Sequence, residues 1–275
     1  MLEARGVEHN VSEAQDSWLL TVPPSLAHRA EDEIQRYSAE RDLPRSTPRR
    51  MQPFPGAAAG AIAYVLVLLI TAYCAGRGLF GRDWLAAGEL EAGAGLDWWR
   101  AATALTLHLD QMHLLSNLLF GVVAGLAAAR LFGPGVAWLS ILVTAACANF
   151  TEMMIAPASH RAIGASTAVF AALGLIAGFA WRERLSLRGR VWYRWAPLIA
   201  GICLLALLGA GDAHVDVLGH ALGFLFGVAA GWIFAYLGVP AHRDRRLQML
   251  AGAAAASLIG AAWLAALHAP VAGAS

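Results

Sequence analysis

Long apolar stretches alternate with short polar loops along most of this chain, and the pattern predicts helices that cross a membrane. About 20 apolar residues suffice for one helix to span the hydrocarbon core. On this basis we expect seven spans, of which the fourth and fifth are short. They cover residues 57–74, 113–132, 136–155, 166–181, 196–210, 217–237 and 250–271.

Composition agrees with this pattern, since 58% of the residues are hydrophobic and only 14% are charged. Such values exclude an ordinary soluble domain of this length and predict an all-α polytopic membrane protein. The first 55 residues differ, because about half of the acidic side chains lie there. We expect a strand at Trp18 to Val22, a helix from about Ser25 to Arg41 with Ser25 as its N-cap, and no chemistry in this segment. The predicted division is residues 1–55, 56–240 and 241–275.

Arginines predict the orientation of the spans. They crowd the chain before the first span, after the fourth and after the sixth, and these three loops fall on one side of the membrane. By the positive-inside rule that side is cytoplasmic, as is the amino terminus. The loop from Ala75 to Gln111, with Trp84, Trp98 and Trp99, then lies outside and in the membrane interface. We expect a multi-pass protein of a bacterial inner (cell) membrane.

Three polar residues of separate spans are predicted to meet at one depth. A helix rises about 1.5 Å per residue, so Asn117, Ser166 and His220 each lie roughly 20–24 Å above the cytoplasmic end of their span. Ionisable groups inside a membrane are costly and therefore indicate function. Gly174 and Gly178, like the glycines after His220, form small-xxx-small faces that let two helices approach closely. The sequence thus predicts that a serine and a histidine face each other.

A hydroxyl beside an imidazole is what nucleophilic catalysis needs, because the imidazole can accept the hydroxyl proton. His113 and Asn117 are one helical turn apart and project from the same face. Their side chains, with the backbone N–H of Ser166, could donate hydrogen bonds to an oxyanion. The leading interpretation from these residues is a hydrolase within the bilayer.

Neither a metal nor a cofactor is predicted. Cys74, Cys147 and Cys203 lie in or beside apolar runs, where buried thiols are common. His108 and His113 are five residues apart, which is a poor helical spacing for joint metal binding. The His-Glu-x-x-His pattern of zinc proteases is absent from the sequence.

Two other classes of membrane protein match parts of the sequence. Asp212, in Gly-x-Gly-Asp, matches one half of an intramembrane aspartyl protease, but no span supplies the second carboxylate that such chemistry needs. A transporter or channel could line a path with His113, Asn117, Glu152 and His220. The absence of an inverted repeat and the ordered serine motif argue against it.

Several short motifs, in order, carry a family resemblance. They are Trp99-Arg100, His108-x4-His113-x3-Asn117, Gly164-x-Ser166-x3-Phe170-x3-Gly174 and Gly219-His220-x2-Gly223. Together they resemble the rhomboid intramembrane serine proteases, over roughly residues 57–237. The resemblance implies a six-helix bundle, to which residues 250–271 would add a seventh helix.

The resemblance also implies a mechanism. Ser166 would attack a peptide carbonyl, His220 would take its proton, and His113, Asn117 and the Ser166 amide would hold the oxyanion. Phe170 would pack against the base. The substrate would be a transmembrane segment of another protein, admitted beside the fifth span, which contains Pro197 and Gly201.

This chain departs from the family pattern at two positions, and a rival interpretation remains. Thr167 stands where the family usually has glycine after the nucleophile. Ala129 replaces an acidic residue often found near the cytoplasmic end of the second span. The rival is a non-proteolytic rhomboid-like protein that binds membrane helices for quality control, although such relatives usually lack the serine or the histidine.

Overall fold

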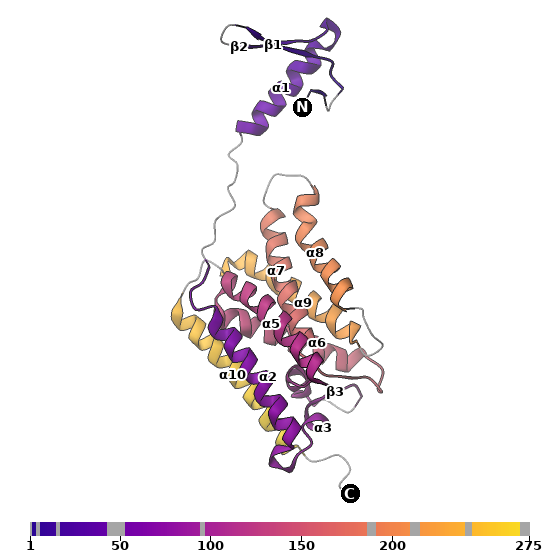
Figure 1. The fold of residues 1–275 in the computed structure, drawn as a ribbon, viewed down its shortest axis with the longest axis vertical. Helices are drawn as coiled ribbons and strands as arrows, with labels where there is room; N and C mark the ends of the chain where they lie inside the picture. Colours follow the sequence, from indigo (N-terminus) through magenta and orange to yellow (C-terminus); the bar gives the residue numbers. More distant parts are fainter. Residues whose placement is uncertain are drawn as a thin grey trace. The chain divides into compact units, whose positions relative to one another are not determined.

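The computed structural model describes residues 2–3, 6–14, 17–42, 53–93, 97–185, 191–209, 215–239 and 244–269. The chain divides into two compact units, Met1–Arg50 and Met51–Ser275, and Figure 1 shows the elements of each. The predicted boundaries after residues 55 and 240 stay predictions.

The amino-terminal unit is a β-hairpin with one helix. Strand β1 (Asn10–Ala14) pairs antiparallel with β2 (Ser17–Thr21), and helix α1 spans Ala27–Asp42. The small core consists of Leu2, Val7 and Ala30. The predicted strand and helix are present, whereas β1 was not predicted. Ser25 does not cap α1 as expected, because it lies inside a 3-10 turn, η2 (Pro24–Leu26), that precedes the helix.

The second unit is a bundle of long apolar helices, and each predicted span overlaps one of them. Five of the described helices, α2, α5, α6, α9 and α10, are long and apolar enough to cross a membrane. This agrees with the predicted all-α polytopic fold; the count of seven spans stays a prediction. The helices are α2 (Ala58–Arg77), α5 (Gln111–Phe132), α6 (Pro134–Ile155), α7 (Ser166–Leu185), α8 (Val191–Gly209), α9 (Val217–Leu237) and α10 (Arg245–His268).

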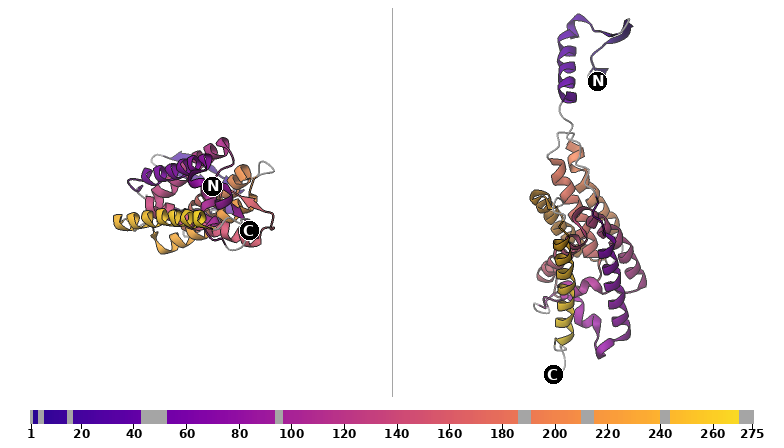
Figure 2. Two further views of the ribbon diagram at one scale, coloured as in Figure 1. Left: turned by 90° about the horizontal axis from the view of Figure 1, so that it is seen from below. Right: turned by 90° about the vertical axis from the view of Figure 1, so that its left-hand side faces the viewer.

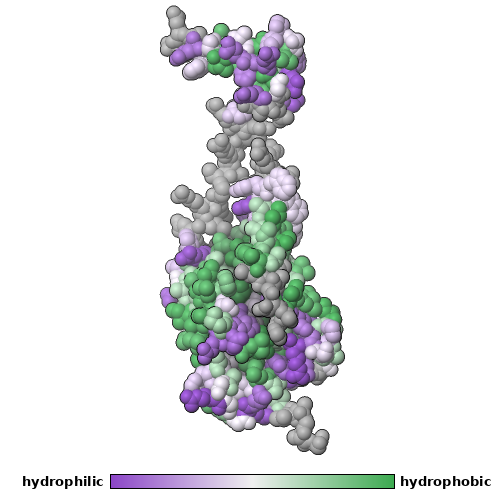
Figure 3. All heavy atoms as spheres, turned by 45° about the vertical axis from the view of Figure 1, so that its right-hand side comes forward, coloured by the Kyte–Doolittle hydropathy of each residue, from purple (hydrophilic) through white to green (hydrophobic). Residues whose placement is uncertain are grey.

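The surface of this unit is suited to lipid. Figure 3 shows hydrophobic residues gathered over the middle of one face and hydrophilic residues at its lower end. The views in Figure 2 show α2 and α10 running along the outside of the bundle. Many of their large apolar side chains, Ile62, Ile70 and Leu264 among them, are more than half exposed. The predicted span ends at Ala210 and Val271 lie outside the described residues.

Helix α7 begins at Ser166, as predicted, but continues to Leu185, beyond Trp181. Its apolar part still ends near Trp181, since Arg182 and Arg184 occupy the last turn. The extra turn carries charges and adds little apolar length. Ser166 is therefore the first residue of a helix that carries arginines at its other end.

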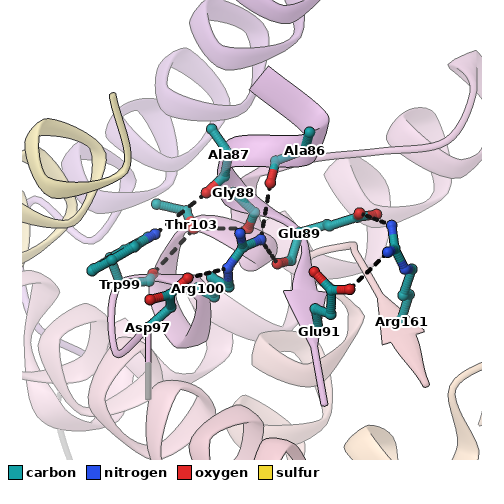
Figure 4. A network of polar contacts seen from close by, with 10 residues as sticks. All are labelled: Ala86, Ala87, Gly88, Glu89, Glu91, Asp97, Trp99, Arg100, Thr103 and Arg161. Atoms are coloured by element: carbon teal, nitrogen blue, oxygen red, sulfur yellow. Dashed lines mark hydrogen bonds and ion pairs between the residues drawn. The ribbon is translucent and has the colours of Figure 1, made fainter. Parts of the chain in front are cut away.

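The chain between α2 and α5 is held by a polar network around Arg100. This segment contains η3 (Leu79–Gly81), α3 (Trp84–Gly88), β3 (Leu90–Glu91), α4 (Arg100–Thr103) and η4 (Ala104–Thr106). Arg100 donates to the carbonyl oxygens of Ala86 (3.0 Å) and Glu89 (2.8 Å) and pairs with Asp97 at 3.0 Å (Figure 4).

The same network reaches the connection between α6 and α7. Strand β3 pairs antiparallel with β4 (Arg161–Ala162). Arg161 bridges Glu89 and Glu91 at 2.5 and 2.7 Å (Figure 4). The loop that leads into Ser166 is thereby fastened to the segment before α5.

Helix α10 is an integral part of the bundle. The Gln248 side chain accepts from the backbone N–H groups of Gly135 and Val136 (2.9 and 3.0 Å) and donates to the Phe132 carbonyl at 3.0 Å. Towards the other end of the helix, the Trp263 indole N–H donates to the Thr106 hydroxyl at 3.1 Å. Ala129, where the family often has an acidic residue, is fully buried. Near this end of α5, Gln248 of α10 and the Phe54 backbone N–H supply polar contacts.

Candidate active site

Five glycines bring the backbones of α7 and α9 into direct contact. A Cβ on Gly223 would lie 2.5 Å from the Thr167 carbonyl oxygen. Gly227 and Gly231 meet the Ala171 and Leu175 carbonyls in the same way, one turn further along each time. From the other helix, Gly174 and Gly178 lie against the α9 backbone at Phe224 and Val228. The two helices are therefore parallel and share one register, as the small-xxx-small pattern predicted.

This register brings the start of α9 level with the start of α7. His220 lies one turn before Gly223, and Ser166 directly precedes Thr167. The Phe170 ring packs on the His220 imidazole, with ring centroids 4.5 Å apart. Ser166 and Phe170 are one turn apart and project from the same helix face. The Ser166 side chain therefore belongs to the face of α7 that His220 covers, and His220 is itself buried.

Gly164 brings α5 to the same place. Its backbone has φ = 131°, a conformation that L-residues with a side chain rarely adopt. A Cβ there would lie 2.6 Å from His113 Nε2 and 3.7 Å from Asn117 Nδ2. The Gly164 N–H donates to the Ala104 carbonyl at 2.9 Å. His113 and Asn117 thus face the loop that ends at Ser166.

The hydrogen bonds around His113 indicate which ring nitrogen carries the proton. Nδ1 lies 3.4 Å from the Leu109 backbone N–H and can only accept from it. The neutral ring then has its hydrogen on Nε2, the atom that faces Gly164. Asp110 caps α5 by accepting from the His113 backbone N–H at 2.8 Å. The ring is thus positioned to donate towards the loop before Ser166.

Asn117 and the helix start supply two further donors. The Asn117 amide uses one hydrogen on the His113 carbonyl at 3.0 Å and keeps a second. Ser166 is the first residue of α7, so its N–H is among those without a partner inside the helix. The His113 and Asn117 donors thus lie beside the loop that ends at Ser166, and N–H donors of this kind can stabilise a developing oxyanion.

Thr167 fits between the two helices. The residue is buried, and its Cγ2 atom would lie 3.1 Å from a Cβ on Gly223. The β-branched side chain is therefore accommodated by the glycine of the facing helix. This contact directs the methyl group towards α9 rather than towards the loop before Ser166.

His108 lies beside His113, with ring centroids 5.1 Å apart. Burial, together with the neighbouring His113 ring, lowers the pKa of His108 to about 4. The side chain is therefore neutral at ordinary pH.

Three further polar residues meet at the start of α9, and the sequence interpretation gave none of them a part in the site. His160 Nε2 lies 3.0 Å from Glu152 Oε1 and 4.0 Å from Asp216 Oδ1. Glu152 is fully buried on α6. Asp216 caps α9 by accepting from the Gly219 N–H at 2.8 Å. The sequence offered one sign of this cluster. Asp216 lies just before the predicted helix that contains His220, where an aspartate is a common N-cap. Asp212, the candidate aspartyl-protease residue, lies outside the described residues.

Comparison with known proteins agrees with this geometry. The Rhomboid domain matches residues 95–237. Rhomboid-like protease 3 of Toxoplasma gondii is 32% identical over 48% of this chain and 49% of its own length. Rhomboid protease GluP of Bacillus subtilis is 29% identical over 52% of this chain and 27% of its own. The chain thus spans about half or less of the length of these relatives. Because the domain match covers more than half of the chain and includes every residue of the candidate site, the chain belongs to the rhomboid family.

Proposed function

We propose that this protein is an intramembrane serine endopeptidase that cleaves transmembrane segments of other membrane proteins, with Ser166 and His220 as its catalytic dyad. The observation that carries the proposal is the shared register of α7 and α9, which brings the Ser166 face against His220. Relatives named as rhomboid proteases support the same class of activity.

In the proposed reaction the Ser166 hydroxyl attacks the carbonyl carbon of the scissile peptide bond while His220 accepts its proton. The oxyanion receives hydrogen bonds from His113, Asn117 and the Ser166 backbone N–H. His220 then gives its proton to the leaving amine, and the C–N bond breaks. Water, activated by His220 in the same way, hydrolyses the acyl enzyme and restores Ser166.

We further propose a cytoplasmic amino terminus, so that cleavage occurs near the outer membrane surface. Helix α8 is the proposed entry side for a substrate helix. It contains Pro197, and its Ile202 and Leu207 side chains are exposed. A disulfide cross-link between α8 and α5 should block cleavage; unchanged cleavage by the cross-linked protein would contradict this entry route.

The dyad is tested by incubating the purified protein in detergent with a generic transmembrane substrate, beside Ser166→Ala and His220→Ala. We expect cleavage by the parent, and a fall in rate of at least about a thousandfold in both variants. Labelling by a fluorophosphonate probe should disappear with Ser166→Ala.

A folded parent that neither cleaves nor reacts with the probe would contradict the proposal. It would favour the alternative, a non-proteolytic protein that binds membrane helices. Capture of the uncleaved substrate helix by parent and variants alike would then be expected. Thr167→Gly, which restores the residue usual in the family, would show whether this threonine suppresses the activity.

A further inference from the structure

Asp216 holds the first turn of α9 at two points. Its side-chain Oδ1 accepts from the Gly219 backbone N–H at 2.8 Å. Its own carbonyl oxygen accepts from the His220 backbone N–H at 3.1 Å. Gly219 and the proposed base, His220, therefore both donate backbone hydrogen bonds to Asp216.

The Asp216 side chain lies beside two residues from a different part of the bundle. His160, in the connection between α6 and α7, lies 4.0 Å from Asp216 Oδ1 and 3.0 Å from Glu152 Oε1. The His160 backbone carbonyl accepts from the Ala92 N–H at 3.0 Å, so the loop has a fixed position. A helix cap needs none of these contacts, since the carboxylate alone satisfies the free N–H groups.

The absence of a side chain at Gly219 is what lets the carboxylates approach. A Cβ there would collide with Asp216 Oδ2 and would lie 2.8 Å from Glu152 Oε2. Two carboxyl groups so close together repel each other unless a cationic or hydrogen-bonding group lies between them. The His160 imidazole lies beside both carboxyl groups and links α6 to the start of α9.

Further down, α9 is fixed against α7 by Gly223, Gly227 and Gly231. The turn from Val217 to His220 lies before this contact, so its position depends on other contacts, among them those of its cap and the Phe170 ring on His220. We propose that Asp216, together with the neighbouring His160 and Glu152, is a positioning residue that helps to fix His220 for the reaction. This inference rests on the proposed function of the dyad.

The test separates capping from positioning by using two caps. Asp216→Ser keeps a side-chain oxygen that can cap α9 but loses the carboxylate beside His160. Asp244 caps α10 through the Arg246 N–H at 2.8 Å, on a helix that carries no proposed catalytic residue. Asp244→Ala is therefore the matched control for loss of a cap.

We expect Asp216→Ser to lower kcat about tenfold or more, with KM within about twofold of the parent, because only the transition state needs the aligned base. His160→Ala should act in the same way, and the double variant should lose little more than either single variant. Asp244→Ala should keep the parent kcat. Parent-like turnover by Asp216→Ser would overturn the proposal and leave Asp216 as a cap alone.

A second measurement needs no catalysis, so failure of the proposed function stays distinguishable. The rate at which diethylpyrocarbonate modifies His220, measured by mass spectrometry, should rise about threefold or more in Asp216→Ser and stay unchanged in Asp244→Ala. Equal rates in all three proteins would overturn the positioning role even if the parent shows no proteolysis.

The same three side chains could instead ligate a metal, since their donor atoms all lie within 4.8 Å of one another. If Asp216 acts by positioning, a chelator should leave the parent activity and the His220 modification rate unchanged. Loss of either property on chelation, with recovery on adding zinc, would replace the proposal by a metal site.

Discussion

At the scale of single residues, the loop before Ser166 is closely constrained at Gly164. The Gly164 backbone lies against the His113 ring, and its N–H is bonded to Ala104. A side chain at this position would have to displace the ring. The orientation of His113, a proposed oxyanion donor, therefore depends on a residue that has no part in the proposed chemistry.

Gly164→Ala should reduce kcat by about a hundredfold or more, through displacement of His113 and strain at a positive φ. The measurement is cleavage of the model substrate beside Gly76→Ala. Gly76 lies within α2, where a Cβ would meet no atom within 4 Å. Activity of Gly164→Ala within threefold of the parent would contradict the proposed place of His113.

His108 gives a prediction about stability and pH. Its pKa falls from 6.5 to about 4 on folding. Between these values the unfolded chain binds more protons than the folded protein. The stabilising contribution is thus complete above about pH 6.5 and is lost as the pH falls towards 4.

Relative to His108→Gln, the parent should lose up to about 3 kcal/mol of stability between pH 6.5 and 4, from 1.36 kcal/mol per pKa unit. Thermal unfolding midpoints in detergent across this pH range provide the measurement. If the midpoints of the two proteins decline in parallel, His108 titrates alike in the folded and unfolded states, contrary to this expectation.

At the scale of helices, α10 completes the turn between two other helices. Gln248 accepts from two N–H groups at the start of α6 and donates to a carbonyl at the end of α5. One amide thus does what two separate helix caps would otherwise do. In this respect α10, which is additional to the six-helix bundle that the resemblance implies, is an integral part of the fold.

Gln248→Ala should destabilise the protein by about 2–3 kcal/mol, because it leaves buried backbone groups without partners. Met249→Ala is the control, since that neighbouring side chain is 66% exposed. Reversible unfolding in mixed micelles measures both. A Gln248→Ala loss no greater than that of Met249→Ala would mean that other groups replace the amide.

The helices could be predicted from the sequence because they depend on local apolar length. The hairpin strand β1 and the Arg100 network could not, since their partners are set by tertiary contacts. Arg161 and Glu89, for example, are 72 residues apart. For the site, spacing and depth identified Ser166, His220, His113 and Asn117 as candidates. They did not identify His160 or Asp216, because a loop histidine acquires meaning only from what the fold brings beside it.

At the scale of the whole molecule, the chain separates its amino-terminal unit from the unit that holds every candidate site residue. The hairpin and α1 have a core of their own, built on Leu2, Val7 and Ala30. The residues proposed for the chemistry all belong to the other unit.

A protein lacking residues 1–50 should therefore keep fluorophosphonate labelling of Ser166 within about twofold of the full chain. The rate of labelling in detergent is the measurement, with Ser166→Ala in the shortened protein as the control. A loss of tenfold or more would show that the amino-terminal unit supports the site.

The buried Glu152 has a consequence for how the protein is made. A carboxylate in the middle of a membrane helix costs about 2.5–3.5 kcal/mol on insertion, and less near the helix end. Glu152 lies in the last turn of α6, which is less apolar than α2, α5, α9 and α10. The nearby His160 is synthesised soon afterwards, but Asp216 and the start of α9 emerge some 60 residues later. We therefore expect the contacts between Glu152 and the start of α9 to form only after α9 has left the ribosome, which makes assembly of this cluster a late step of biogenesis.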